Sequence, residues 1–168
     1  RVVQVHPTLR CNLACPHCYS SSSPHAVGEL EPHALIERLE QLRAEGYETV
    51  SFSGGEPLVY RGLFEVADAA KSLGFRVNAI SNGLRLTPER ADALARSFSL
   101  IGLSLDGAPE RHDRMRGRPG AFSQLEARIP LLRERGLRFG FAHCVTAESI
   151  EDLPWLLDHA IEQGASLL

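Results

Sequence analysis

The sequence has no excess of positive charge and no long hydrophobic run. Its formal net charge is −3 over 168 residues, whereas proteins that bind nucleic acid or anionic membrane surfaces usually carry a basic patch. No apolar stretch approaches the length of a transmembrane helix, and the first residues lack the apolar core of a signal peptide. We therefore expect a cytoplasmic protein with no nucleic-acid partner and no membrane partner.

Cysteine is scarce, and three of the four cysteines fall within eight positions. The stretch RCNLACPHCYS (residues 10–20) places Cys11, Cys15 and Cys18 at the spacing Cys-x3-Cys-x2-Cys. In a reducing cytosol such a cluster is more often metal-binding or catalytic than part of a disulfide framework. Three thiolates can hold an iron–sulfur cluster by three of its four irons, which leaves one iron open to a ligand or substrate.

Three other interpretations stay open from the residues alone. Structural zinc sites usually take four ligands, and His17 or His6 could complete such a set, although no second CxxC pair is present. The CPHC segment (residues 15–18) has the pattern of a redox dithiol, but that interpretation leaves Cys11 without a role. Free cysteines also pack as small hydrophobic residues, and we expect this of Cys144 because it lies in an apolar strand.

Predicted strands and helices alternate along the chain. The hydrophobic pattern predicts strands over residues 2–6, 47–53, 75–81, 100–107 and 138–146, with a sixth beginning near Leu167. It predicts helices over residues 31–46, 63–74, 87–97, 122–135 and 150–163, and an arginine-rich loop that contains RHDRMRG (residues 111–117). Strands separated by helices of this length favour an α/β fold with a parallel sheet.

Residues with chemical potential follow four of the predicted strands. The cysteines come after the first strand, GGEP (residues 54–57) after the second, Ser81-Asn82-Gly83 after the third, and SLDG (residues 104–107) ends the fourth. Because parallel sheets bind ligands at the carboxyl ends of their strands, we expect these four segments to meet at one rim.

The segments CNLACPHC (residues 11–18) and GGEP, each after its own strand, resemble the two signature motifs of the radical S-adenosylmethionine (radical SAM) superfamily. The resemblance covers essentially the whole chain and implies a partial parallel (βα)6 barrel, TIM-barrel-like and truncated at the sixth strand. We therefore expect residues 1–168 to form a radical SAM core domain. The abrupt ends at Arg1 and Leu168 suggest that it is part of a longer chain.

The resemblance also implies cofactors and a reaction. One 4Fe-4S cluster, held by Cys11, Cys15 and Cys18, would reductively cleave S-adenosylmethionine to a 5′-deoxyadenosyl radical that abstracts a substrate hydrogen. The protein would then be an enzyme of oxidoreductase or lyase-type radical chemistry, with an electron donor such as flavodoxin or ferredoxin. In such enzymes the cofactors carry the reactivity, while the protein orients them and excludes competing reactions.

Further site residues follow from the resemblance position by position. His17 matches the position that contacts the adenine region, and the Gly-Gly-Glu triplet matches the motif that holds the methionyl amino group. Ser81 and Asn82 match a polar pair near the ribose. The set expected to bind S-adenosylmethionine is His17, Gly54, Gly55, Glu56, Ser81, Asn82, Ser104, Asp106 and Arg116.

The substrate class rests on one stretch of similarity. SLDG and the following RHDRMRG resemble the peptide- and protein-modifying branch with SPASM or twitch domains, in which a serine and a downstream arginine contact the cofactor. Ser104 and Arg116 match these, and a guanidinium suits a carboxylate because it binds bidentately. A peptide or protein substrate is therefore the first expectation. An enzyme of small-molecule cofactor biosynthesis and a zinc-binding, non-catalytic module remain as alternatives, and no substrate acid or base can be assigned.

Overall fold

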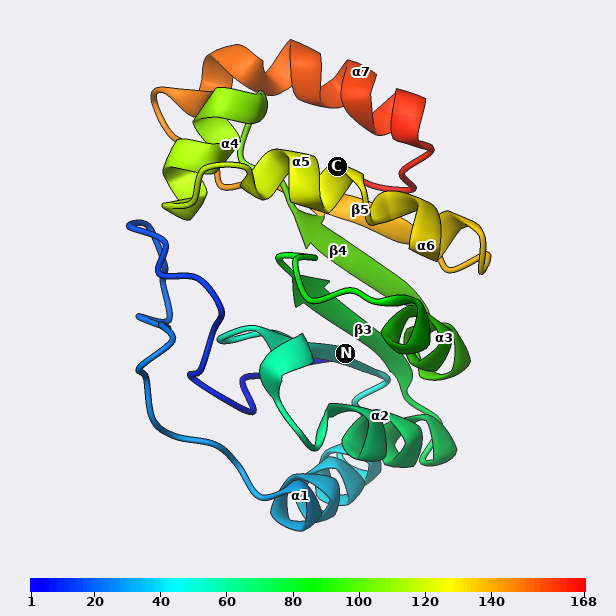
Figure 1. Ribbon diagram of the computed structural model, residues 1–168. Coiled ribbons are helices and arrows are strands. Elements are labelled where there is room, and N and C mark those ends of the chain that lie inside the picture. The colour runs from blue at the N-terminus through cyan, green and yellow to red at the C-terminus, as the bar shows by residue number, and fades with distance from the viewer.

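The computed structural model describes residues 1–168, and its centre is a five-stranded parallel sheet (Figure 1). The strands follow one another in sequence order across the sheet, and each pairs in parallel with the next. They are β1 (Val2–Val5), β2 (Thr49–Phe52), β3 (Arg76–Ser81), β4 (Leu100–Ser104) and β5 (Phe139–Ala142). The predicted parallel α/β core, a partial TIM-like barrel, is confirmed.

Helices connect the strands and bury their apolar faces against the sheet. Helix α1, for example, buries Leu35, Leu39 and Leu42, which lie on one face at helical spacing. Parallel neighbours need such crossover connections, because a tight turn joins only antiparallel strands. The helices are α1 (Pro32–Ala44), α2 (Leu63–Ser72), α3 (Pro88–Ser97), α4 (Pro109–Arg116), α5 (Ala121–Glu126), α6 (Ile129–Arg133) and α7 (Leu153–Gln163), with short 3₁₀ turns η1 (Pro57–Val59) and η2 (Ser149–Asp152).

The segment between β1 and α1 is long and contains no helix or strand. We call residues 6–31 the cysteine loop, since they contain Cys11, Cys15 and Cys18. Figure 1 shows this loop, in blue, on the side toward which the arrowheads of β3 and β4 point. The loop therefore lies at the carboxyl ends of the strands, as the positions of the motifs predict.

The prediction of a loop over residues 111–117 is wrong, because this stretch forms most of α4. Pro109 occupies the first turn, and Gly117 ends the helix in the left-handed conformation at φ +61°. The hydrophobic pattern does not predict this helix because almost all of its side chains are polar. His112 is its one buried residue.

Two other predicted helices begin or divide at prolines. The helix expected over residues 122–135 is split into α5 and α6, and Pro130 lies in the first turn of α6. Pro154 likewise lies in the first turn of α7, after η2. Proline lacks the amide donor of a helix interior and is tolerated only in the first turn.

The chain's last residues run beside β5. The amide of Phe141 donates to the carbonyl of Leu167 at 2.9 Å, and the amide of Ser166 donates to that of Phe139 at 2.7 Å. The expected sixth strand near Leu167 is thus present as paired backbone, although too short to form a strand of its own. Separately, none of the helices is both long and apolar enough to cross a membrane.

Candidate functional site

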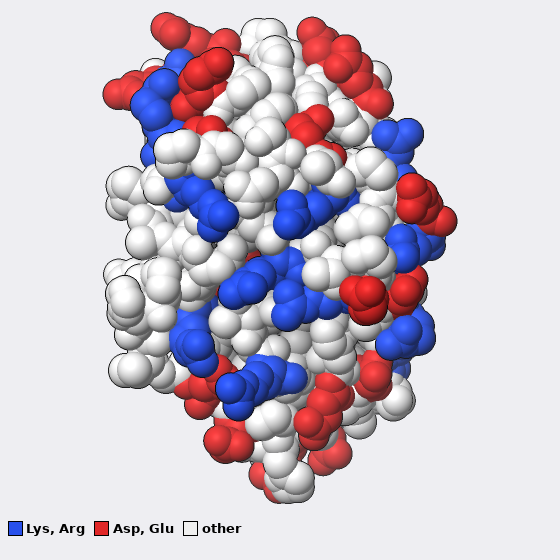
Figure 2. All heavy atoms as spheres, viewed as in Figure 1, with Lys and Arg blue, Asp and Glu red and all other residues white.

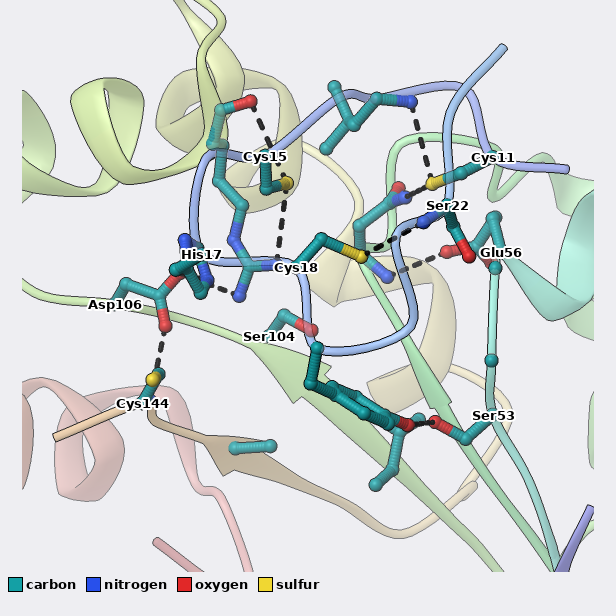
Figure 3. A pocket seen from close by; sticks show the side chains of 18 of the residues that line it. Cys11, Cys15, His17, Cys18, Ser22, Ser53, Glu56, Ser104, Asp106 and Cys144 are labelled. Carbon is teal, nitrogen blue, oxygen red and sulfur yellow. Dashed lines mark hydrogen bonds and ion pairs between the residues drawn. The ribbon is translucent and has the colours of Figure 1, made fainter. Parts of the chain in front are cut away.

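The carboxyl ends of the strands surround a cavity of about 490 Å³. All three cysteines of the cysteine loop line it, and Figure 3 shows them between Glu56 on one side and Asp106 on the other. Segments after β1, β2, β3 and β4 therefore meet at one place, as expected. Of the other predicted site residues, those that line the cavity are His17, Gly54, Gly55, Glu56, Asn82, Ser104, Asp106 and Arg116.

Cys18 is surrounded by the hydroxyl groups of the serine-rich segment that follows it. Its sulfur lies 3.4 Å from Ser20 Oγ and accepts from the amide of Ser22 at 3.4 Å. Burial alone would raise the pKa of this thiol, but the hydrogen bonds from Ser20 and Ser22 outweigh it and lower the pKa from 9.0. Ser20 also donates to the carbonyl of Gly54 at 2.8 Å, which ties this end of the loop to the segment after β2.

Cys11, at the other end of the motif, is more shielded from solvent than Cys18. Burial raises the pKa of its thiol from 9.0 to about 11. The amide of Leu13 donates to its sulfur at 3.4 Å, and Asn82 Nδ2 approaches the sulfur at 3.8 Å. Asn82 also donates to Asn12 Oδ1 at 3.0 Å. The side chain of Asn82 thus holds the start of the cysteine loop against the end of β3.

Cys15 lies against the end of α4. Its thiol donates to the carbonyl of Arg116 at 3.7 Å, and Arg116 Nη1 is 4.0 Å from the sulfur. Burial raises the pKa of this thiol, and the positive charge of Arg116 opposes the increase. A β-carbon at Gly117 would make only an ordinary contact, 3.4 Å from the carbonyl oxygen of Ala14, so glycine is favoured here by its left-handed φ of +61° and not by close packing.

The glycines of the GGEP turn (residues 54–57) are required by contact with the cysteine loop. A β-carbon at Gly55 would lie 2.1 Å from the carbonyl oxygen of Arg10, and one at Gly54 would lie 2.7 Å from the β-carbon of His6. The amide of Gly55 donates to the carbonyl of Thr8 at 2.9 Å. The close backbone approach that glycine permits is therefore made, within this chain, to the loop that carries the cysteines.

The carboxylate of Glu56 is buried and receives three hydrogen bonds. Its Oε1 accepts from Ser81 Oγ at 2.7 Å and from the amide of Leu58 at 3.1 Å, while its Oε2 accepts from the amide of Asn82 at 2.8 Å. Burial raises the pKa of Glu56, and these hydrogen bonds oppose the increase. A carboxylate has about four acceptor sites, so one on Oε2 remains for a further donor.

Ser81 does not line the cavity, contrary to the expected place near the ribose. Its hydroxyl is buried, donates to Glu56 and accepts from the amide of Gly83 at 3.0 Å. The residue lies at the last position of β3, and its hydroxyl meets the Glu56 carboxylate inside the protein. Ser81 therefore supports Glu56 within the protein's own structure.

A buried ion pair holds the opposite side of the cavity. Asp106, with no exposed side-chain surface, lies 2.7 Å from Arg116 Nη2 and 3.4 Å from His17 Nε2. Two nearby nitrogen atoms, Arg116 Nε and His17 Nδ1, are buried without a hydrogen-bond partner. Buried polar atoms are normally hydrogen-bonded, so both are available to a bound group: Arg116 Nε as a donor, and His17 Nδ1 as a donor or an acceptor according to its tautomer.

Two residues beyond β5 belong to the cavity although the sequence analysis did not place them there. His143 and Cys144 both line it, and Cys144 is exposed, which overturns its expected place in the core. The reason is that β5 ends at Ala142, two residues before the cysteine. The amide of Cys144 donates to Asp106 Oδ1 at 3.2 Å. The rule that site residues follow strands could have indicated this pair.

The three cysteine sulfurs line one cavity without forming a compact single-ion site. No three cysteine, histidine or acidic side chains gather closely enough to bind one metal ion, and a structural zinc ion needs about four ligands at about 2.0–2.3 Å. No ready-made site for a single ion is therefore present among these side chains. Three thiols spaced around one cavity suit a larger cluster, in which each sulfur binds a different iron.

Comparison with known proteins gives a family and a fold. A family model described as the radical SAM superfamily matches residues 5–160. Fe-coproporphyrin III synthase of Methanosarcina barkeri is 32% identical over 159 residues, which are 94% of this chain and 40% of that protein. PqqA peptide cyclase of Ruegeria pomeroyi is 34% identical over 164 residues, covering 96% of this chain and 44% of that protein.

A solved structure with the same fold is that of SuiB from Streptococcus suis. In complex with the precursor peptide SuiA, it matches 98% of this chain and 37% of its own with a TM-score of 0.85 and 20% identity. Its complex with S-adenosylmethionine gives a TM-score of 0.80. The chain spans less than half the length of these relatives.

We predict that Asp106→Asn is much more costly to stability than Asp92→Asn. The first substitution leaves the Arg116 guanidinium, 13% exposed, without its buried counter-charge, and should lower the free energy of unfolding by about 3–5 kcal/mol. Asp92 is 56% exposed in its pair with Arg135, so its loss should cost less than about 1 kcal/mol. Urea denaturation followed by circular dichroism measures both; equal costs would contradict the buried pair.

We also predict a pH dependence that originates at His112. Burial, reinforced by the charge of Arg116, lowers the pKa of His112 from 6.5 to about 4, and its Nδ1 accepts from the amide of Asp106. The unfolded chain binds this proton below pH 6.5 and the folded chain only near pH 4. Stability should therefore fall by roughly 3 kcal/mol as the pH drops through this window.

The test is the urea midpoint measured between pH 7 and pH 4. The variant His112→Gln should show a shallower decline than the wild-type protein, while His33→Gln, at an exposed position, should leave the decline unchanged. A decline of the same steepness in His112→Gln would show that other groups are responsible.

Proposed function

The chain belongs to the radical SAM superfamily, and we therefore propose that residues 1–168 are the catalytic core of a longer radical SAM enzyme. The superfamily uses a 4Fe-4S cluster together with S-adenosylmethionine. When both are bound, they supply reductive cleavage of S-adenosylmethionine and a 5′-deoxyadenosyl radical that abstracts a substrate hydrogen.

The observation that carries the proposal is the meeting of two motifs in one cavity. The three thiols of the cysteine loop line the same cavity as Gly54, Gly55 and Glu56. The GGEP turn is also packed directly on the backbone of that loop. A protein that needed the cysteines only for packing would have no reason to join them to a buried carboxylate with a free acceptor site.

Cys11, Cys15 and Cys18 would hold the cluster, and the cavity walls would hold the rest of the reactants. The remaining acceptor site on Glu56 suits the amino group of a methionyl ligand. Across the cavity, the unpartnered Nε of Arg116 suits its carboxylate, because a guanidinium donates in a planar fork. His17 lies beside Arg116 through the shared contact with Asp106, which suits the adenine end.

We propose a peptide or protein side chain as the substrate. Support comes from the SLDG and RHDRMRG stretches and from a relative named as a peptide cyclase. The α4 stretch supplies Arg116 at its last turn and the Asp106 partner lies just before the helix, so the residues that carry the similarity are also those that form the wall. A tetrapyrrole is the second candidate, since another relative is named Fe-coproporphyrin III synthase.

The test compares two cysteine variants after anaerobic reconstitution with iron and sulfide. Cys15→Ala should lose nearly all cluster iron and all 5′-deoxyadenosine formation from S-adenosylmethionine with dithionite. Cys144→Ala should keep about four irons, because Cys144 lies in the same cavity but outside the motif. Iron per protein and chromatography of the nucleoside are the measurements. Full iron loading in Cys15→Ala, or zinc uptake in place of iron, would refute the function.

A further inference from the structure

A second cavity, of about 510 Å³, lies on the other side of the cysteine loop. Four arginines are among its ten lining residues, and none of the ten is acidic. We call this surface the arginine face; its basic residues are Arg10, Arg85, Arg118 and Arg128. Cys11 lines both this cavity and the candidate active site. The arginine face therefore reaches a candidate cluster ligand from outside the active-site cavity.

The charges of the arginine face are not neutralised within the chain. None of its four arginines forms a salt bridge, whereas Arg111 and Arg116 on the neighbouring α4 segment pair with Asp152 and Asp106. Arg128 donates only to the backbone carbonyls of Leu86 and Gln124.

The other three arginines keep their charge at the surface. Arg10, Arg85 and Arg118 are exposed, and the one side-chain partner among them is Gln124, which accepts from Arg118 at 3.2 Å. Figure 2 shows basic side chains gathered across the middle of this view, with acidic side chains mainly around its edges. The chain as a whole has a net charge of −3, so the positive surface is local and calls for a local partner.

The position of the arginine face limits what the partner does. In the proposed function, S-adenosylmethionine and the substrate occupy the active-site cavity. An electron donor therefore has to approach Cys11 from another side. The cluster must still receive one electron from outside for each cleavage. Cys11 is the one of the three cysteines that lines the arginine face as well as the active-site cavity.

We propose that the arginine face is the docking surface for an acidic electron-carrier protein, a donor with a low-potential one-electron centre beneath a surface of carboxylates. This inference rests on the proposed function and deepens it. In the docked complex the donor loses one electron and the cluster gains one, with no bond made or broken at the surface. Clustered charges of opposite sign steer such encounters and raise the association rate 10- to 1000-fold.

The electrostatics also predict the character of the complex. Redox partners bury small interfaces and dissociate quickly, and exposed charges are screened once the Debye length falls to a few ångströms. Binding should therefore be weak and strongly dependent on salt. Arg128, fixed by backbone carbonyls, gives the face a rigid basic anchor, while Arg85 and Arg118 can adjust to the partner.

The experiment measures binding of a purified flavodoxin, with an acidic surface around its flavin, to the reconstituted protein by titration calorimetry. The double variant Arg85→Gln/Arg118→Gln should bind more weakly, with a dissociation constant raised about 10-fold at low salt. It should also slow cluster reduction by reduced flavodoxin, followed by stopped-flow absorbance. The difference from wild type should vanish at about 0.5 M salt.

The matched control is Arg76→Gln/Arg138→Gln, which removes two exposed arginines without salt bridges at the amino ends of β3 and β5. It should bind flavodoxin as the wild type does. Equal weakening by both double variants, or by neither, would overturn the docking surface. Binding of polyglutamate is measured in the same way. If Arg85→Gln/Arg118→Gln weakened polyglutamate binding but not flavodoxin binding, the face would be assigned to an acidic peptide and the docking surface would be overturned.

A dithionite arm separates this inference from the function itself. Dithionite needs no docking surface, so wild type and both double variants should form 5′-deoxyadenosine equally with it. Product with dithionite and unchanged flavodoxin binding in the arginine variant would refute the docking surface while the enzyme function stands. Absence of product from the wild type with dithionite would refute the function, on which the inference rests.

Discussion

Two buried carboxylates fix the cysteine loop from opposite sides, and the geometry of the site depends on them. Glu56 binds the GGEP turn to the end of β3, and Asn82 at that strand end reaches Cys11. Asp106 holds Arg116 at the end of α4, and Arg116 contacts Cys15. A loop with almost no regular structure is therefore positioned by charges that cannot move without losing their partners.

Burying a carboxylate is unfavourable unless donors or cations replace the water it loses. Glu56 meets this demand with two backbone amides and a hydroxyl, and Asp106 meets it with a guanidinium and the amide of Cys144. Both are among the residues that line the cavity, although almost none of their surface is exposed. Groups held so rigidly need no rearrangement when a charged ligand arrives, which is the condition for electrostatic preorganisation.

Much of this was predictable from the sequence because the governing patterns are local. Strand and helix periodicity gives the parallel sheet, and the sheet then brings the segments with Cys11, Glu56 and Asp106 to one rim. Helix α4 was missed because its polar sequence has no apolar periodicity, although Pro109 and Gly117 marked its ends. Cys144 was misplaced because β5 stops pairing at Ala142, earlier than its apolar sequence indicates. Ser81 was misplaced although β3 ends where predicted, because its hydroxyl is taken by Glu56 from a separate segment, a contact that only long-range packing decides.

We propose that three cysteines, positioned by the chain's own buried groups, leave one iron of a cluster open. Mössbauer spectroscopy of the protein reconstituted with ⁵⁷Fe, recorded with and without S-adenosylmethionine, tests it most directly. We expect about four irons per protein, of which one alone changes its isomer shift when S-adenosylmethionine is added. Four irons that all remain unchanged, or a protein that takes up no cluster iron, would contradict it.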